Sequence, residues 1–185
     1  MDELHNDAKV ANILHCPLEN VEKNLETIYS ALANRACLTS EVACGVLGTI
    51  GIETASTFQP VCEAFWLDET ARAKYYDSTA YGKLDPDTKQ RYYGRGFIQR
   101  TWKSGYLASG QALKLPLLQQ PDLLLRPDCA AADLALFWAT KTGLIHACTV
   151  HDWYEVRRLV SGGYPEASRL ASTCHALFVL SGKPF

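Results

Sequence analysis

The sequence has no large excess of charge of either sign. Eighteen lysine and arginine residues oppose twenty aspartate and glutamate residues, which leaves a formal charge of −2. This balance supplies no general field for holding a nucleic-acid backbone, so we expect no nucleic-acid partner. It supplies no attraction to anionic membranes or cell walls either, and binding to them would need a local basic patch.

Long apolar runs are also missing. The most apolar stretches, 130–139 and 176–180, fall far short of the roughly 18 residues that indicate a membrane span, so we expect no stable membrane insertion. The first seven residues are acidic, where a secretion signal needs a basic flank followed by an apolar run. The sequence therefore predicts a chain made in the cytoplasm without a signal peptide.

Paired cysteine motifs are absent, although cysteine itself is present. Seven cysteines are scattered without any Cys-x-x-Cys pair, which makes a poor disulfide framework and a poor zinc site. Cys44 and Cys174 have apolar neighbours, where a reduced thiol acts as a small hydrophobic side chain. The five histidines show no clustered ligand spacing, so we expect no metal and no zinc-amidase chemistry.

Alternation long enough for a good strand is scarce, whereas apolar residues recur at helical spacing through most of the chain. The segments 21–32 and 41–54 are the clearest helices, the second capped by Thr39 or Ser40 with Glu41 in its first turn. Further helices are expected over 7–14, 98–113, 127–142 and 165–180, and one opened by a capping box at Thr149 and ended before Gly162. The polar segment 68–91 could hold a short helix or a small hairpin. No repeat or linker divides the chain, which predicts one mainly α domain over residues 1–185.

Two glutamates stand out by their positions. Glu53 lies in the nearly uncharged window 48–58, where desolvation favours the protonated carboxyl that a general acid needs. Glu63 follows ten residues later, beyond the break that Pro60 makes in helical continuation. Such carboxyls can face each other across a cleft, roughly 6.5–9.5 Å apart, with one protonating a glycosidic oxygen while the other activates water. The alternative is a solvated helix-end glutamate and a surface glutamate.

A second cluster, of polar and aromatic side chains, runs from Arg91 to Trp102, with Tyr106 one helical turn beyond. Its glycines let the backbone approach a ligand, its amide and hydroxyl groups can bind sugar hydroxyls or water, and its rings offer flat faces to sugars. The pattern fits a carbohydrate site and, equally, a tight turn packed with aromatic core residues.

Three segments resemble motifs of family 19 glycoside hydrolases, the family of chitinases and phage endolysins. Residues 92–102, Tyr-Tyr-Gly-Arg-Gly-Phe-Ile-Gln-Arg-Thr-Trp, resemble the family signature Tyr-Tyr-Gly-Arg-Gly-Pro/Phe-Ile-Gln-Leu-Ser/Thr. Residues 50–60 resemble its first acidic motif, and residues 157–163 are similar to its Arg-Arg-Ile-Asn-Gly-Gly segment. The three occur in the family's order.

The resemblance implies a lysozyme-like α+β helical domain with a substrate cleft and at most a small β-hairpin. It implies inverting hydrolysis of a β-1,4 linkage at an N-acetylhexosamine, with Glu53 as general acid and Glu63 as general base. Glu69 is the alternative base, and Thr101 takes the place of the hydroxyl that helps to hold the attacking water. The substrate-binding residues that it implies are Tyr93, Gln99, Arg158 and Ser161. As an alternative, Arg157 and Arg158 only pair with helix-end carboxylates.

These inferences together predict a peptidoglycan-degrading endolysin. We expect a muramidase, or lysozyme, that cuts between N-acetylmuramic acid and N-acetylglucosamine for host cell lysis. The alternatives are a chitinase and a non-catalytic glycan-binding relative. The expected partner is the glycan strand of peptidoglycan, or chitin, bound by a monomer without a cofactor. The phage resemblance implies export through a phage-encoded pore protein and action on the bacterial cell wall.

Overall fold

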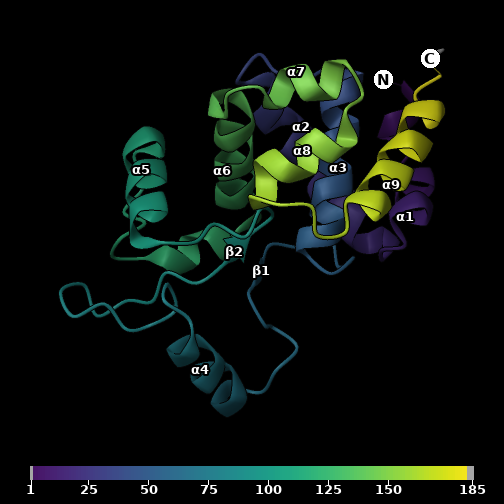
Figure 1. The fold of residues 1–185 in the computed structure, drawn as a ribbon. Coiled ribbons are helices and arrows are strands. Elements are labelled where there is room, and N and C mark those ends of the chain that lie inside the picture. The colour runs from purple at the N-terminus through teal and green to yellow at the C-terminus, as the bar shows by residue number, and fades with distance from the viewer. Residues whose placement is uncertain (1, 183–185) are drawn as a thin grey trace. The chain divides into compact units, whose positions relative to one another are not determined.

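The computed structural model describes residues 2–182 (Figure 1). Its contacts divide the chain into two compact units: unit 1, made of Met1–Phe58 and Ala135–Phe185, and unit 2, Gln59–Leu134. The boundary between the units falls within helix α6 (Pro127–Thr140). One catalytic domain over the whole chain stays a prediction. No helix among residues 2–182 is long and apolar enough to cross a membrane.

Unit 1 is a helical bundle built around one buried helix. Its elements are η1 (Asp2–His5), α1 (Asp7–Leu14), α2 (Leu18–Ala33), α3 (Ser40–Glu53), α7 (Leu144–Thr149), α8 (Trp153–Ser161), α9 (Ala167–Leu180) and the end of α6. Helix α3 contacts α1, α7, α8 and α9, and Figure 1 shows it among these helices. Because α3 is buried from Val42 to Gly51, its apolar residues cover every face.

Small residues on α3 make room for thiols. A Cβ at Gly45 would lie 2.8 Å from the sulfur of Cys148, and one at Gly48 would lie 2.7 Å from the sulfur of Cys174. Both cysteines are free and buried. The predicted burial of thiols is confirmed for these two positions, and their reduced state stays a prediction.

The two ends of α3 are fixed by threonine hydroxyls. At the start, the side chain of Thr39 accepts a hydrogen bond from the backbone N–H of Val42 at 3.2 Å, as the capping pattern predicts. At the end, the buried Thr54 hydroxyl donates to the carbonyl of Ile50 at 2.7 Å and accepts from the N–H of Phe58 at 3.1 Å. The chain therefore leaves the helix in a closed turn immediately after Glu53.

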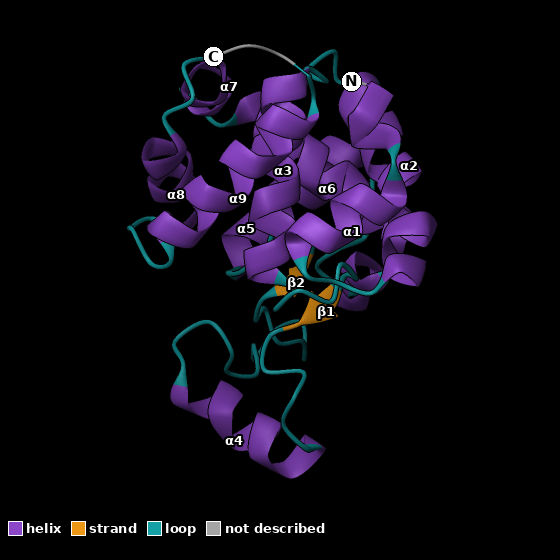
Figure 2. Ribbon diagram, turned by 90° about the vertical axis from the view of Figure 1, so that its right-hand side faces the viewer, coloured by secondary structure: helices purple, strands orange, loops and turns teal. Residues whose placement is uncertain are grey.

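Unit 2 carries the only two strands that the described residues form. Its elements are β1 (Val61–Cys62), α4 (Glu69–Ser78), β2 (Arg95–Gly96), α5 (Lys103–Leu113), η2 (Pro121–Leu125) and the start of α6. The strands pair antiparallel, with Val61 opposite Gly96 and Cys62 opposite Arg95 (Figure 2). The predicted mainly α fold with at most a small β-hairpin is confirmed. The polar segment 68–91 contributes a helix, α4, between the strands.

Several helix boundaries differ from the sequence pattern, and two of the differences have a clear local cause. The helix expected over 98–113 begins only at Lys103, because Gln99 and Trp102 have positive φ angles of 51° and 67°. The helix expected to open at Thr149 begins at Trp153, and Asp152 caps it by accepting from the N–H of Glu155 at 2.9 Å. Thr149 instead ends the separate helix α7.

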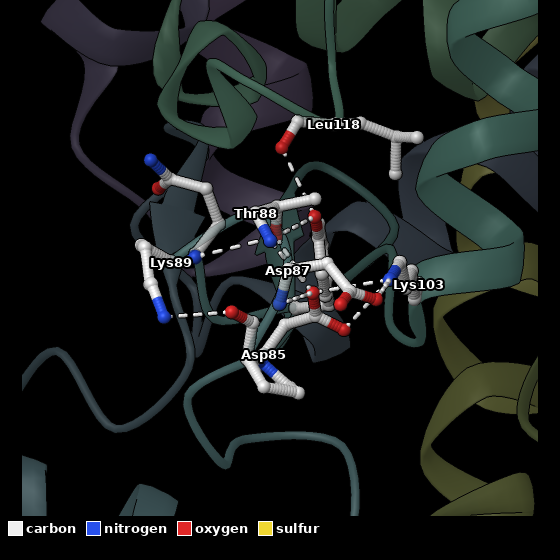
Figure 3. Close-up of polar contacts among 9 residues, drawn as sticks. Asp85, Asp87, Thr88, Lys89, Lys103 and Leu118 are labelled. Carbon is white, nitrogen blue, oxygen red and sulfur yellow. Dashed lines mark hydrogen bonds and ion pairs between the residues drawn. The ribbon is translucent and has the colours of Figure 1, made fainter.

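A polar network fixes the loop before the 92–102 segment (Figure 3). Asp85 accepts hydrogen bonds from the backbone N–H groups of Asp87 and Thr88, at 3.1 and 2.9 Å, and its carboxylate lies 2.8 Å from the ammonium of Lys103 on α5. The hydrogen bond from Lys103 and those from the turn hold the pKa of Asp85 far below its ordinary value. The Thr88 hydroxyl, in turn, lies 2.7 Å from the Tyr92 hydroxyl, which donates to the carbonyl of Leu118. The loop is thus tied to the core of unit 2.

Candidate active site

Glu53, the proposed acid, is the last residue of α3 in unit 1. Its carboxyl oxygen Oε1 accepts a hydrogen bond from Nη1 of Arg157 on α8. The Arg157 side chain is only 6% exposed and that of Glu53 only 17%, so this is a largely buried ion pair. No hydrogen bond from the described residues reaches the second oxygen, Oε2. One carboxyl oxygen is therefore fixed while the other is open to a further partner.

Arg157 is itself held in place by the chain that follows α8. Its Nε donates to the carbonyl of Pro165 at 2.7 Å. The Ser161 hydroxyl donates to the carbonyls of Arg157 and Gly163, both at 2.9 Å, and so closes the end of α8. Ser161 thus makes backbone contacts beside Arg157, and its predicted part in binding substrate stays a prediction.

The arginine at Glu53 is Arg157, for which the sequence offered pairing with a helix-end carboxylate as the alternative to a part in the substrate cleft; Glu53 is such a helix-end carboxylate. The local window around Glu53 is uncharged, yet Arg157 reaches it from 104 residues further along the chain. Arg158, predicted to bind substrate, is exposed and pairs with Glu155 on its own helix, with Nε donating at 2.6 Å. This ion pair agrees with the alternative expectation that Arg158 only pairs with a carboxylate, and its contact with substrate stays a prediction.

Glu63, the proposed base, follows β1 and is surrounded by hydrogen-bond donors from unit 2. Its Oε1 accepts from the hydroxyls of Tyr75 and Tyr81, at 2.8 and 2.7 Å, and its Oε2 accepts from the backbone N–H of Gly94 at 3.0 Å. The backbone of Glu63 donates to the carbonyl of Gly94 at 2.7 Å and accepts from the hydroxyl of Tyr76. Three donors therefore orient both oxygens of the carboxyl group.

The two tyrosines at Glu63 stay protonated at neutral pH. The hydrogen bond to Glu63 raises the pKa of Tyr75, and burial together with the bond to Glu63 raises the pKa of Tyr81. Both phenols are therefore neutral donors. The sequence marked Tyr75 and Tyr81 only as members of a polar segment, because nothing local links them to Glu63.

The glycine at position 94 allows this close approach. A Cβ on Gly94 would lie 2.7 Å from the side-chain oxygen of Gln99 and 3.3 Å from the Cβ of Glu63. Gln99, predicted to bind substrate, donates from its amide nitrogen to the carbonyls of Val61 and Gly96, both at 3.0 Å. Its amide N–H groups thus join β1 to β2, and its contact with substrate stays a prediction.

The other residues singled out in 92–102 have different settings. Tyr93 stacks on Tyr76, with ring centroids 3.8 Å apart, and the guanidinium of Arg95 lies 3.6 Å from the Tyr93 ring centroid. Thr101 is half-buried and precedes Trp102, whose side chain is 52% exposed and meets Tyr81 edge-on at 5.5 Å. Unit 2 thus gathers Glu63, Tyr81 and the exposed Trp102 ring into one chain of contacts.

Two further expectations concern Glu69 as the alternative base and the absence of a metal site. Glu69, the alternative base, is exposed in the first turn of α4, and no donor like those at Glu63 holds its carboxylate among the described residues. Within residues 2–182, no group of three or more His, Cys, Asp and Glu side chains could hold a metal ion. Of the two candidate bases, only Glu63 has a set of donors among the described residues, and which of the two acts as the base stays a prediction.

Comparisons with known proteins agree with this reading of the motifs. A family model described as chitinase class I matches residues 37–158. A protein of Arabidopsis thaliana named as an endochitinase is 47% identical over 74 residues, which cover 38% of this chain and 25% of that protein. The chain thus matches about a quarter of the length of such curated relatives.

Solved structures extend the likeness to nearly the whole chain. Chitinase C from Streptomyces griseus HUT6037 has a TM-score of 0.67 at 23% identity, covering 96% of this chain and 76% of its own. A bacterial family 19 chitinase has a TM-score of 0.66 at 25% identity, covering 96% of this chain and 95% of its own. The fold described above is therefore the fold of these enzymes.

Proposed function

Because the chain belongs to family 19 of the glycoside hydrolases, we propose that Glu53 and Glu63 are the general acid and the general base of an inverting hydrolysis. The bond broken is a β-1,4 linkage at an N-acetylhexosamine. The observation that carries the proposal is that each glutamate has its own fixed set of donors, Arg157 for Glu53 and two tyrosines with one backbone N–H for Glu63. Such preorganised side chains are what acid–base catalysis requires.

At Glu53, the open oxygen Oε2 would carry the proton and give it to the glycosidic oxygen as the C–O bond breaks. The carboxyl group then becomes a carboxylate. Arg157, already bonded to Oε1, stabilises this negative charge as it forms. The arginine therefore favours the product of the proton transfer.

At Glu63, the carboxylate would accept a proton from the water that attacks the anomeric carbon from the opposite face. The three donors hold the carboxylate in one orientation, so the lone pair that takes the proton has a fixed direction. Thr101 would help to hold the same water through its hydroxyl. No cofactor is needed for this displacement.

For the substrate, we propose the glycan strand of peptidoglycan, cut between N-acetylmuramic acid and N-acetylglucosamine. Charged side chains of both signs, among them Glu69, Arg72 and Asp122, line a pocket together with Cys62, the neighbour of Glu63. This supports a substrate with charged groups, whereas chitin is uncharged. The setting we propose is lysis of a bacterial host by a phage endolysin that reaches the cell wall through a pore protein.

Chitin hydrolysis is the second candidate. The relatives named as chitinases favour it. The chain matches about a quarter of the length of the plant endochitinases, and the activity of those whole proteins is not carried over to it by this match. Specificity therefore has to be measured on both polymers.

The test is a digestion of purified peptidoglycan and of colloidal chitin, with mass spectrometry of the products. A muramidase leaves N-acetylmuramic acid at the new reducing ends, a glucosaminidase leaves N-acetylglucosamine, and an amidase releases peptides. We expect muramic acid ends, and a loss of about 100-fold or more in Glu53→Gln and Glu63→Gln. The exposed Glu22→Gln serves as a control with the same change of charge.

Two results would contradict the proposal. Unchanged wall digestion by Glu53→Gln would remove the acid role. Release of chitobiose from chitin, without loss of turbidity from bacterial walls, would select the chitinase instead.

A further inference from the structure

A pocket of about 370 Å³ lies in unit 2 beside the turn that carries Glu63. Its wall includes Cys62, the last residue of β1, and Tyr76, whose hydroxyl donates to the backbone carbonyl of Glu63. The volume falls within the roughly 300–1,000 Å³ of small-molecule sites. The pocket is therefore large enough for a ligand, and one of its wall residues, Tyr76, is hydrogen-bonded to the turn that carries Glu63.

Four charged side chains line this pocket, two of each sign. They are Glu69, Arg72, Arg91 and Asp122. Two of them already have partners: Arg91 donates to Asp77 and to the carbonyl of Gly82, and Asp122 accepts from Nε of Arg95 at 2.7 Å. The pocket as a whole has no net charge, which fits a ligand that itself carries both signs.

Arg72 is the cation of the pocket that these internal bonds leave available. Its Nη1 donates to the sulfur of Cys62 at 3.4 Å, a weak acceptor, and no carboxylate among residues 2–182 forms an ion pair with it. A guanidinium has five N–H donors in a planar fork that matches a carboxylate. Arg72 is thus a half-buried cation in the wall of a pocket with most of its donors unused.

We propose that this pocket binds the stem peptide of peptidoglycan, with a free carboxylate of the peptide on Arg72 and its ammonium group beside Asp122 and Glu69. The inference rests on the proposed function. Stem peptides carry free carboxylates and, at diaminopimelate or lysine, an ammonium group, whereas chitin carries neither. The muramic acid that bears the stem is the sugar whose anomeric carbon the water on Glu63 attacks, so its peptide belongs on the Glu63 side.

The direct test uses Cys62 as a reporter of occupancy. Cys62 and Cys16 are the two half-buried cysteines of the described chain, and only Cys62 lines this pocket. The protein is alkylated with iodoacetamide, with or without the tripeptide L-Ala-γ-D-Glu-meso-diaminopimelate, and peptide mapping gives the rate at each thiol. We expect the tripeptide to slow alkylation of Cys62 severalfold and saturably, and to leave Cys16 unchanged.

Variants of Arg72 show whether its guanidinium binds the tripeptide or only supports the wall of the pocket. Arg72→Gln should lose the protection, Arg72→Lys should keep part of it, and Lys74→Gln, an exposed cation on the same helix, should keep all of it. The ratio of rates with and without tripeptide is compared within each variant, since Arg72 also contacts the thiol. No protection in the wild type, equal protection in Arg72→Gln, or equal protection by chitotriose would overturn the inference.

A turnover assay tells this inference apart from the proposed function. On stem-bearing glycan, Arg72→Gln should lower kcat/KM severalfold, and on glycan stripped of its peptides it should match the wild type. Equal losses on both glycans would mean that Arg72 only supports the Glu63 turn, and would overturn the inference. Protection of Cys62 without any glycan cleavage would contradict the proposed function and leave peptide binding standing. Glycan cleavage without protection of Cys62 would contradict peptide binding and leave the proposed function standing.

Discussion

The two glutamates, one in each unit, are held in opposite ways. Glu53 has one charged partner, the largely buried Arg157, whereas Glu63 has three neutral donors, two phenols and a backbone N–H. A cation stabilises a carboxylate through its charge, while several neutral donors fix the direction of both oxygens. The comparison suggests that charge matters most at Glu53 and orientation most at Glu63.

The largest effect in this comparison is expected at Arg157. Arg157→Met would leave Glu53 without its partner inside the bundle, and breaking such a pair costs about 3 kcal/mol of unfolding free energy. We expect that loss in denaturant unfolding, together with a fall in glycan hydrolysis of about 100-fold. Arg158→Met, which removes the neighbouring exposed arginine, should change neither measurement. Equal effects of the two substitutions would mean that Glu53 does not depend on the buried cation.

A smaller effect is expected from crowding Glu63. Gly94→Ala puts a Cβ 2.7 Å from the amide oxygen of Gln99 and 3.3 Å from the Cβ of Glu63, so the Gln99 amide has to move and the Glu63 side chain has to give way slightly. A displacement of this size should lower kcat about 10- to 100-fold with little change in secondary structure by circular dichroism. The control is Gly51→Ala on α3, where the new Cβ meets Leu14 at an ordinary 3.5 Å. Full activity of Gly94→Ala would show that orientation at Glu63 is not limiting.

The tyrosines at Glu63 should differ from each other in their titration. The hydrogen bond to Glu63 is the main cause of the raised pKa of Tyr75, whereas burial is the main cause for Tyr81. In Glu63→Gln, therefore, the pKa of Tyr75 should return to near its ordinary value, and that of Tyr81 should stay raised. Ultraviolet titration of the phenols, with Tyr75→Phe and Tyr81→Phe to assign them, measures this. Equal downward shifts would mean that burial does not distinguish the two.

The smallest effect is expected away from both glutamates, at Asp85. Its folded-state pKa is held below the ordinary value, chiefly by Lys103, so its contribution to stability is present above about pH 4 and is lost as the pH falls further. Lys103→Gln should weaken this dependence. The melting temperature of the wild type should then drop more between pH 5 and pH 2.5 than that of the variant. Parallel curves would contradict the role of this ion pair.

The sequence predicted the position of Glu53 better than it predicted the surroundings of Glu63. Helix α3 and the position of Glu53 at its end followed from local spacing, and capping chemistry narrowed its cap to Thr39 or Ser40, of which the structure uses Thr39. The partners of Glu63 did not, because Tyr75, Tyr81 and Gly94 meet it only through α4 and the pairing of β1 with β2. For Arg157 the sequence offered pairing with a helix-end carboxylate as an alternative but did not identify Glu53 as the partner, since an ion pair across 104 residues leaves no local pattern.

The helix expected over 98–113 was wrong at its start for a different reason. Gln99 and Trp102 adopt the left-handed region although neither is glycine, and propensity rules do not anticipate this. The surrounding contacts impose it: the Gln99 amide joins the two strands, and the Trp102 N–H donates to the carbonyl of Tyr92 at 2.9 Å. Tertiary hydrogen bonds therefore decided the backbone here.

The hydroxyl of Thr54 has a practical consequence for protein engineering. It closes a ring with Ile50 and Phe58, while Asn20 and Asn24 of α2 bind the carbonyls of Thr57 and Phe58 at 2.8 and 2.9 Å. The residues just after Glu53, up to and including Phe58, are thereby clamped on both sides, so an insertion among them would break these hydrogen bonds. A designer who wants a wider range of substrates should insert residues beyond Phe58 and leave 54–58 untouched.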